Sequence, residues 1–498
     1  MTTTSRADQR QYELTRSKLV WLVTAILLLL IIDFMSPRAG LSTAGQRVLG
    51  ISVFAVIMWI SEAVPYDYIS IGIVLLLAIS LGFSPAIGTT GGFLGTAKAL
   101  QIAVSGFIST GTILVTAALL LAAAIQIAGL EQRIAFSILK VVGPKPRRIF
   151  AGIIVIMLVL DFLIPSIIAR TSVVTPLAMS LLTTFGIDRK SVFARNLLIC
   201  VALSASISGI GVLSAGIPNV IAVSLIERYA HHSILWIDWL IYSLPYCAAL
   251  MLALYFLVTR LNKFEFDEIP GGRKGIDEAL AKLGPLTARE KRISLISILT
   301  IILWATENYH KVDVGTVAVF AVMLTLSPYI GITNWRELSD RANVGSIVLI
   351  ASAAVSLGQA LLDTGGATWL VKTTLGNLGL QNMVPWMMMA TLVVALSFIR
   401  FAFASITSAS ATLIPIVLAL LLSFENPTLP VWGMALIATY TIYFSFILPV
   451  SSPQNMIAYG TGTFEVKDLM KIGIPLSVIS LVLLAVFWCT YWHWLAVI

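Results

Sequence analysis

The residues best suited to chemistry in this sequence are serine, threonine and proline side chains in a segment that occurs twice. Residues 161–182 and residues 400–421 align without a gap at one constant offset, which places Ser166 opposite Ser405. Hydroxyl groups and the free N–H groups at helix starts bind anions without any covalent step. A polar, proline-containing interruption repeated in corresponding halves of an apolar chain points to the binding site of a secondary transporter.

The first copy reads Pro165-Ser166-Ile167-Ile168-Ala169-Arg170-Thr171. At the tip of a re-entrant hairpin, this string would point N–H groups and hydroxyls into a cavity, and Arg170 would add a fork suited to carboxylate. A proline-kinked helix with Arg170 at its cytoplasmic end is the competing interpretation. The second copy, Ser405–Thr412, carries hydroxyls at five of its eight positions. Small-residue helix packing is the alternative reading there.

Two further strings combine proline and asparagine with glycine or serine. They are Ala215-Gly216-Ile217-Pro218-Asn219 and Pro449-Val450-Ser451-Ser452-Pro453-Gln454-Asn455. Such residues break a helix, and the freed carbonyl groups can hold a cation or orient N–H groups toward a ligand. A plain helix kink is the alternative for each string.

Asp161 and Arg400 are ionisable residues at equivalent positions of the repeat, each within an apolar stretch. A charge near the centre of a bilayer costs about 2.5–3.5 kcal/mol on insertion scales, so each side chain needs a partner. Two arrangements are open. The two residues pair with each other across the pseudo-two-fold axis, or each reaches water locally.

The composition is that of a polytopic membrane protein. Of 498 residues, 58% are hydrophobic and 11% are charged, and the mean hydropathy is +0.95. Apolar runs long enough to span a bilayer recur along the chain. The net charge of +8 sits in short loops, which favours positive-inside topology over nucleic-acid binding. We expect an integral protein of a bacterial inner membrane, surrounded by lipid.

Lysine and arginine placement predicts the domain organisation. Residues 1–45 hold an N-terminal segment and the first spanning helix, residues 46–260 a first repeat, residues 261–290 a cytoplasmic linker, and residues 291–498 a second repeat. Basic clusters place the N-terminus in the cytoplasm and the C-terminus outside. The hairpins, near 150–187 and 386–423, then enter from opposite sides, so the repeats are inverted.

Three strings resemble motifs of the divalent anion/sodium symporter family, and in particular its exchanger branch. That branch includes 2-oxoglutarate/malate translocators and citrate/succinate and tartrate/succinate exchangers. Pro165-Ser166-x-x-Ala169-Arg170 resembles the family's P-S-N/T-T-A-R hairpin tip. The string from Leu448 to Asn455 resembles its L-P-V-A-T-P-P-N loop, and the string from Trp59 to Pro65 resembles its W-I-T-E-A-I-P segment. The resemblance extends over nearly the whole chain after residue 20.

The resemblance implies an all-α polytopic homodimer with about eleven spanning helices and two re-entrant hairpins, in which a transport domain moves as an elevator. It also implies a small organic anion as substrate. Carried over by position, the substrate-binding residues are Ser166, Thr171, Asn219, Ser405, Thr407, Ser452, Pro453 and Asn455, to which the charge argument adds Arg170.

Departures from the motifs bear on sodium, the coupling ion that the family implies. Ile167-Ile168 stands where the first motif has Asn-Thr, and Ile406 stands where the second has Asn. Sodium coordination needs several oxygen ligands, so these changes argue against sodium coupling. A fixed cation at Arg170 would take over part of sodium's electrostatic role and favour exchange of di- or tricarboxylates over symport.

Two other functions were weighed against exchange. Sodium-coupled symport of a dicarboxylate or of sulfate fits the same fold. A membrane-embedded enzyme would need a catalytic constellation such as H-E-x-x-H or a Ser/His pair, and the sequence contains none. We therefore predict a transporter without a catalytic site or an organic cofactor.

Overall fold

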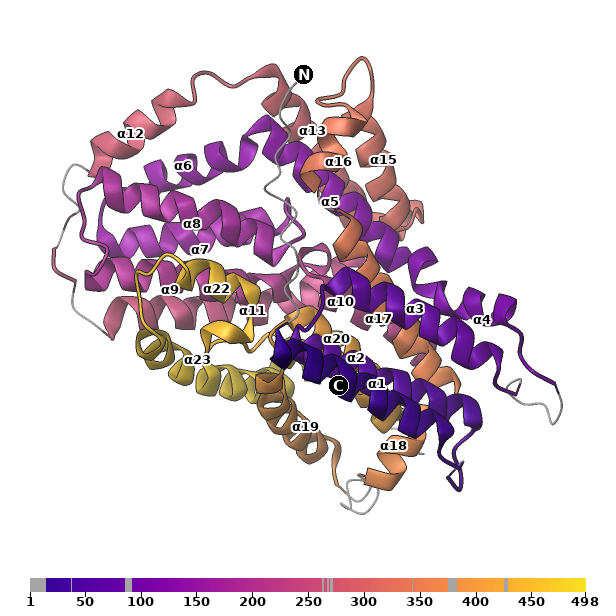
Figure 1. The fold of residues 1–498 in the computed structure, drawn as a ribbon. Helices are drawn as coiled ribbons and strands as arrows, with labels where there is room; N and C mark the ends of the chain where they lie inside the picture. The colour runs from indigo at the N-terminus through magenta and orange to yellow at the C-terminus, as the bar shows by residue number, and fades with distance from the viewer. Residues whose placement is uncertain are drawn as a thin grey trace.

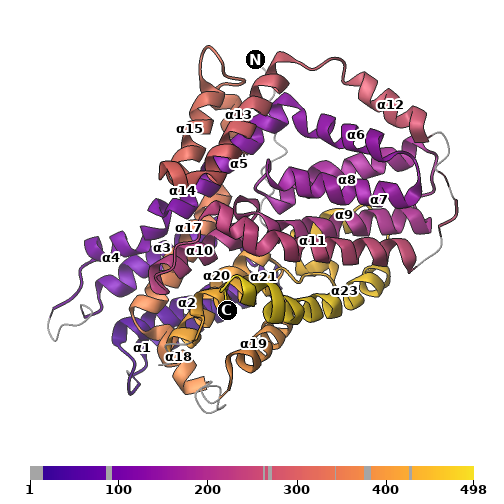
Figure 2. The ribbon, with the colours of Figure 1, turned by 180° about the vertical axis from the view of Figure 1, so that it is seen from behind.

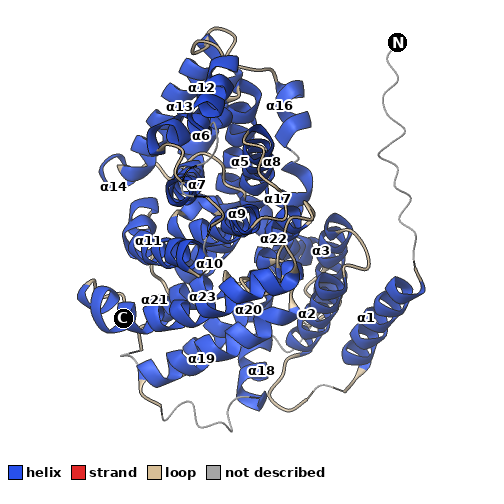
Figure 3. Ribbon diagram, turned by 90° about the vertical axis from the view of Figure 1, so that its left-hand side faces the viewer, coloured by secondary structure: helices blue, strands red, loops and turns tan. Residues whose placement is uncertain are grey.

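The computed structural model describes residues 15–36, 38–85, 92–261, 264–266, 268, 272–342, 344–374, 383–424 and 429–498. Within these ranges the regular structure is helical, apart from one isolated bridge between Pro85 and Phe93 (Figure 3). Nine of the described helical segments are long and apolar enough to cross a membrane. The predicted all-α polytopic fold is confirmed.

Most helices before the linker pack in two groups (Figure 1). Helices α1 to α4 pack one on the next and form one group, and α7, α8, α9 and α11 form the other, with α6 packed on α7. Helices α5 and α10 pack on each other and lie outside these two groups. Their bounds are α1 Arg16–Phe34, α2 Thr43–Ser61, α3 Tyr66–Gly82, α4 Thr96–Ala103, η1 Ser105–Ile108, α5 Thr110–Ala128, α6 Leu130–Val142, α7 Pro146–Asp161, α8 Ile167–Thr184, α9 Val192–Gly211, η2 Leu213–Ala215, α10 Ile217–Tyr229 and α11 Trp236–Arg260.

The helices after α11 follow a similar order. Their bounds are α12 Gly272–Lys282, α13 Ala288–Ala305, α14 Glu307–His310, α15 Val314–Leu326, α16 Trp335–Ala342, α17 Val344–Asp363, α18 Gly366–Thr374, α19 Pro385–Ile399, η5 Arg400–Ala402, α20 Ile406–Leu422, α21 Val431–Ile442, η6 Pro449–Ser451, α22 Pro453–Tyr459, α23 Val466–Phe487 and η7 Trp488–Trp492. The division into inverted repeats, with the boundaries given above, stays a prediction.

Two helix pairs position the site. In each pair a first helix begins with proline at its start, where the missing N–H costs nothing, and a short break separates it from a second helix. These pairs are α7 with α8 and α19 with α20. Both limbs of the first pair pack on α9, and both limbs of the second pack on α21. Figures 1 and 2 show α7, α8 and α9 side by side.

Two breaks interrupt the helices that follow these pairs. The chain leaves α9 through η2 into α10, and it leaves α21 through η6 into α22. Pro218 and Pro453 lie in the first turn of the helix after each break, where proline fits. Helix α22 packs on α8 and α9, and α10 packs on α20 and α21. The broken segments of the two halves therefore meet near the centre of the molecule.

The linker after α11 packs along the base of the first helix pair. The ring of Phe264 stacks on Phe150 of α7 at a centroid distance of 5.3 Å. Glu265 accepts hydrogen bonds from the N–H groups of Val192 and Phe193, so its carboxylate satisfies the start of α9. The side of the membrane on which this linker lies stays a prediction.

Candidate functional site

The starts of α8 and α20 face a common cavity of about 140 Å³. A water needs roughly 10–15 Å³ by this measure, so the space suits about ten waters or a small organic anion. Its lining comes from both pairs, from both breaks and from α3, α5 and α17. The lining residues are Tyr66, Leu119, Pro165, Ser166, Ile167, Ile168, Gly216, Ile217, Pro218, Ile347, Ile350, Ser405, Ile406, Thr407, Ser408, Pro453 and Gln454.

Each pair turns at a serine in the N-cap position of its second helix, where the backbone is extended and the first helical turn follows. Ser166 Oγ accepts a hydrogen bond from the N–H of Ala169 at 3.2 Å. Ser405 makes no such side-chain bond. Within the described part of the chain, no hydrogen bond engages the hydroxyls of Ser405 or Thr407 either, so both stay free for a ligand.

Asn219 and Asn455 brace the two breaks in the same way. The Nδ2 group of Asn219 donates to the carbonyls of Gly209 and Val212 at 2.8 and 2.9 Å. The Nδ2 group of Asn455 donates to the carbonyls of Ser445 and Leu448 at 2.6 and 3.3 Å. Both asparagines are fully buried and lie outside the cavity lining. In this geometry they hold backbone in place.

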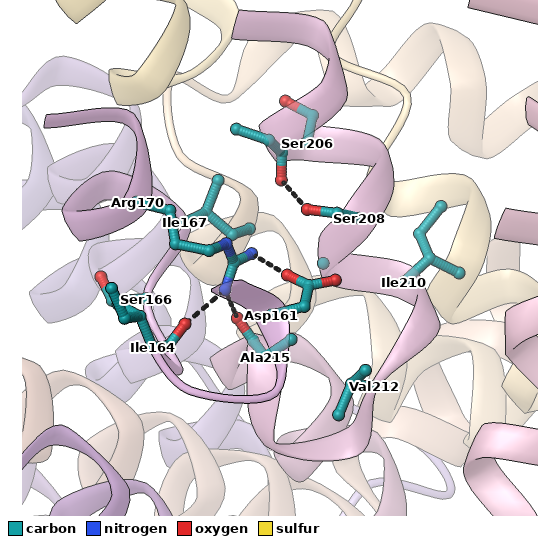
Figure 4. A network of polar contacts seen from close by, with 12 residues as sticks. Asp161, Ile164, Ser166, Ile167, Arg170, Ser206, Ser208, Ile210, Val212 and Ala215 are labelled. Atoms are coloured by element: carbon teal, nitrogen blue, oxygen red, sulfur yellow. Dashed lines mark hydrogen bonds and ion pairs between the residues drawn. The ribbon is translucent and has the colours of Figure 1, made fainter. Parts of the chain in front are cut away.

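The contacts of Arg170 differ from those expected from the sequence, which placed its guanidinium in the cavity. Its side chain has no exposed surface and is not part of the cavity lining. Figure 4 shows its guanidinium directed toward Asp161, Ile164 and Ala215. Nη1 donates to the carbonyl of Ile164 and, at 3.2 Å, to that of Ala215. Nη2 forms an ion pair with Asp161 Oδ1 at 2.7 Å. A carboxylate from its own hairpin thus occupies the fork that was expected to take a substrate carboxylate.

Arg400 does not pair with Asp161. Its Nε donates to the carbonyl of Ile442 at 2.9 Å, and its Nη1 and Nη2 donate to the carbonyls of Phe403 and Ser451. No carboxylate of the described residues forms an ion pair with it. Neither arrangement expected for the two equivalent charges holds, because backbone carbonyls solvate Arg400 and Arg170 neutralises Asp161.

The two arginines occupy matching places. Ile164 and Phe403 lie at equivalent positions before the second helix of each pair, and Ala215 and Ser451 each end the short turn within a break. One guanidinium in each half therefore joins the tip of a helix pair to the adjacent break.

The cavity brings together four of the nine predicted site residues: Ser166, Ser405, Thr407 and Pro453. The other five do not line the cavity. Thr171 donates to the carbonyl of Ile167, and Ser452 is buried with no hydrogen-bond partner for its hydroxyl among the described residues. Arg170, Asn219 and Asn455 bind backbone, as described above.

Sequence reasoning missed most of the apolar lining. Tyr66 directly follows the recognised Trp59–Pro65 string and donates to Glu62 at 2.7 Å, so its position could have been suspected. Ile347 and Ile350 come from α17, an apolar helix in which isoleucine carries no signal.

Comparison with known proteins supports the transporter assignment. The family described as the sodium:sulfate symporter transmembrane region matches residues 16–498. A Cupriavidus necator chain named only as a membrane protein is 36% identical over 475 residues, covering 95% of this chain and 92% of that one. The L-tartrate/succinate antiporter of Escherichia coli K12 is 27% identical over 472 residues, covering 92% of this chain and 94% of that protein.

Two solved transporters share the fold. The Alcanivorax borkumensis YdaH transporter has a TM-score of 0.55 at 13% identity and covers 86% of this chain and 99% of its own. The Neisseria gonorrhoeae MtrF efflux pump has a TM-score of 0.53 at 11% identity and covers 87% and 96%. At these identities the likeness concerns fold alone.

The expectation of a transporter rather than an enzyme is confirmed by the family and its relatives. The motifs at the helix tips, the all-helical membrane fold and the match over residues 16–498 agree, and this chain belongs to the divalent anion/sodium symporter family of membrane transporters.

Proposed function

We propose that this transporter exchanges small organic anions, in the first place dicarboxylates. The supporting observation is the cavity between the two helix tips, where the free hydroxyls of Ser405 and Thr407 and the helix starts at Ile167 and Ile406 offer donors to carboxylate groups. A relative of similar length is named an L-tartrate/succinate antiporter, which favours the same class of substrate.

The hydrogen bonds at the two helix breaks support the proposal that exchange does not need sodium. Backbone carbonyls of such breaks are ordinary sodium ligands in transporters. Here the carbonyls of Ile164 and Ala215 accept from Arg170, and those of Phe403 and Ser451 accept from Arg400. Guanidinium groups thus stand where a coupling cation would need oxygen, and these two places do not fit sodium. Asp161 neutralises Arg170, so Arg400 is the internal cation whose charge stays uncompensated, and an anion bound on both journeys balances it best.

The remaining parts of the proposal concern motion, assembly and placement. The cavity lies between the tips and breaks on one side and α3, α5 and α17 on the other, an arrangement suited to a transport domain that slides as an elevator. We further propose a homodimer in a bacterial inner membrane, with the N-terminus cytoplasmic and the C-terminus outside, as the family and the distribution of basic residues imply.

Sodium-coupled symport of a dicarboxylate or sulfate is the second candidate function. Two buried oxygens, Ser452 Oγ and Asn455 Oδ1, have no hydrogen-bond partner within the described residues. The first-half counterpart of Asn455 Oδ1 is Asn219 Oδ1, which accepts a hydrogen bond from the Tyr443 hydroxyl at 2.7 Å. A coupling cation could therefore still find oxygen ligands at Ser452 and Asn455.

Thermal unfolding of the purified protein tests the substrate class. A ligand that binds the folded state stabilises it by mass action. Succinate and related dicarboxylates should raise the unfolding temperature equally in sodium and in choline buffer, and sulfate should not. Stabilisation by sulfate alone, or by dicarboxylate only when sodium is present, would contradict the proposal.

A further inference from the structure

Most of the surface that the cavity exposes is apolar. Its walls include six isoleucines and a leucine: Ile167, Ile168, Ile217, Ile347, Ile350, Ile406 and Leu119. Both arginines near the tips point their donors at backbone carbonyls rather than into the cavity. A hydroxyl group in the middle of a bound substrate would meet apolar surface over much of this wall, and burying it without a partner is unfavourable.

The two tips also differ from each other. At the first tip, Ile168 is 46% exposed at the cavity and the neighbouring charge of Arg170 is neutralised by Asp161. At the second tip, the equivalent position holds Thr407, whose hydroxyl is free, and the charge of Arg400 faces no carboxylate among the described residues. The first tip therefore has Ser166 and a helix start beside an exposed isoleucine and carries no net charge, whereas the second tip has two free hydroxyls and an uncompensated cation behind it.

We infer that the cavity selects organic anions with an apolar body, such as alkyl-substituted dicarboxylates, over hydroxylated acids of the same charge. A carboxylate lies at the second tip against Thr407 and Ser405. The second carboxylate lies at Ser166 and the start of α8, and the apolar substituent between the two carboxylates lies toward Ile168. This inference rests on the proposed function, because it assigns the substrate class of the same cavity.

The expected size of the preference follows from burial. Each methyl group moved from water into an apolar wall strengthens binding roughly fourfold. A site that leaves a substrate hydroxyl unpaired weakens binding by about tenfold. Between 2,2-dimethylsuccinate and malate, a difference of about a hundredfold is therefore within reach.

Calorimetric titration of the full-length protein in detergent tests the inference with four ligands of equal charge. The expected order of affinity is 2,2-dimethylsuccinate, then succinate, then malate, then tartrate. Tighter binding of malate or tartrate than of 2,2-dimethylsuccinate would overturn the apolar selectivity and leave the proposed function standing. Binding of none of the four would overturn both.

A substitution at each tip locates the effect. Ile168→Asn should abolish the preference for 2,2-dimethylsuccinate over malate, because the amide offers the missing hydrogen bonds. The matched control is Ile330→Asn, at an isoleucine that is 49% exposed in the loop after α15 and outside the cavity; it should keep the wild-type order.

Thr407→Val keeps the shape of the second tip and removes its hydroxyl. It should weaken all four ligands by about the same factor and leave their order intact, because every one of them places a carboxylate there. A wild-type order in Ile168→Asn, or a changed order in Thr407→Val, would contradict the proposed orientation of the substrate.

Discussion

The two helix pairs fill the same structural place with an arginine that arrives from opposite directions. In the first pair Arg170 follows the tip, on α8, and in the second pair Arg400 precedes the tip, after α19. Both reach a carbonyl beside the tip and a carbonyl of the adjacent break. The same contact is made by an arginine from two different sequence positions. This indicates that the fold needs a cation at each place, whichever position supplies it.

The surroundings of the two arginines differ in charge. Asp161 neutralises Arg170, and three backbone carbonyls solvate Arg400. Carbonyl dipoles stabilise a buried guanidinium but leave its net charge in place, so the second half keeps a positive charge beside a tip rich in hydroxyls. The two halves therefore share a scaffold but differ in how they contact an anion: the second half has the uncompensated positive charge and more hydroxyl groups.

The largest expected effect is the loss of the unneutralised charge. Arg400→Met removes a cation and leaves three buried carbonyls without their donor, each at about 1–3 kcal/mol. Exchange of labelled dicarboxylate in proteoliposomes should fall by about a hundredfold or more.

Arg400→Lys is the control, because it keeps the charge and part of the hydrogen bonding; it should retain measurable exchange. Gel filtration shows whether each variant is folded. A folded Arg400→Met protein with wild-type exchange would contradict the proposal that the second half binds the anion through an uncompensated charge.

The ion pair of the first half comes next. Arg170→Ala leaves the carboxylate of Asp161 buried and unpaired, which should cost about 3–5 kcal/mol in stability and sharply weaken exchange. The double variant with Asp161→Ala should recover part of that stability, because no unpaired charge remains.

Chemical denaturation of the wild type, both single variants and the double variant measures the coupling between the two residues. Additive losses would show that Asp161 and Arg170 stabilise the protein independently, and would remove the distinction between a neutralised and an unneutralised half.

The smallest effect concerns the two asparagines. Tyr443→Phe removes the hydroxyl that donates to Asn219 Oδ1 and leaves that oxygen as unpartnered as Asn455 Oδ1. The free energy of unfolding should fall by about 1 kcal/mol, since one buried hydrogen bond is lost. Thermal unfolding checks the shift. Gly216→Ala is a poor control, because its Cβ would lie 2.3 Å from the Tyr443 hydroxyl.

The sequence predicted the helix pairs better than it predicted their contacts. The constant offset between Ser166 and Ser405 placed both capping serines and the starts of α8 and α20, because N-capping is local chemistry. The same offset set Arg400 opposite Asp161 and suggested a pair that does not form. Which carbonyl a long guanidinium reaches depends on the packing of broken helices far apart in sequence.

For the site residues too, the sequence predicted their identity better than their contacts. Polar residues that interrupt an apolar chain were visible, and Ser405 and Thr407 do line the cavity. Asn219 and Asn455 were equally visible, yet they bind backbone, because a break frees carbonyl groups that need donors. Ile347 and Ile350 were invisible, since lipid-facing and cavity-facing isoleucines look alike in a sequence.

Both arginines occupy carbonyl oxygens that a coupling cation would need, and we propose that the uncompensated charge of Arg400 requires an anion to travel in each direction. Uptake of labelled succinate into proteoliposomes tests it most directly, with and without internal succinate, in sodium and in choline buffer. Uptake should require internal anion and should be the same in both buffers. Uptake into empty vesicles that rises with external sodium would contradict it.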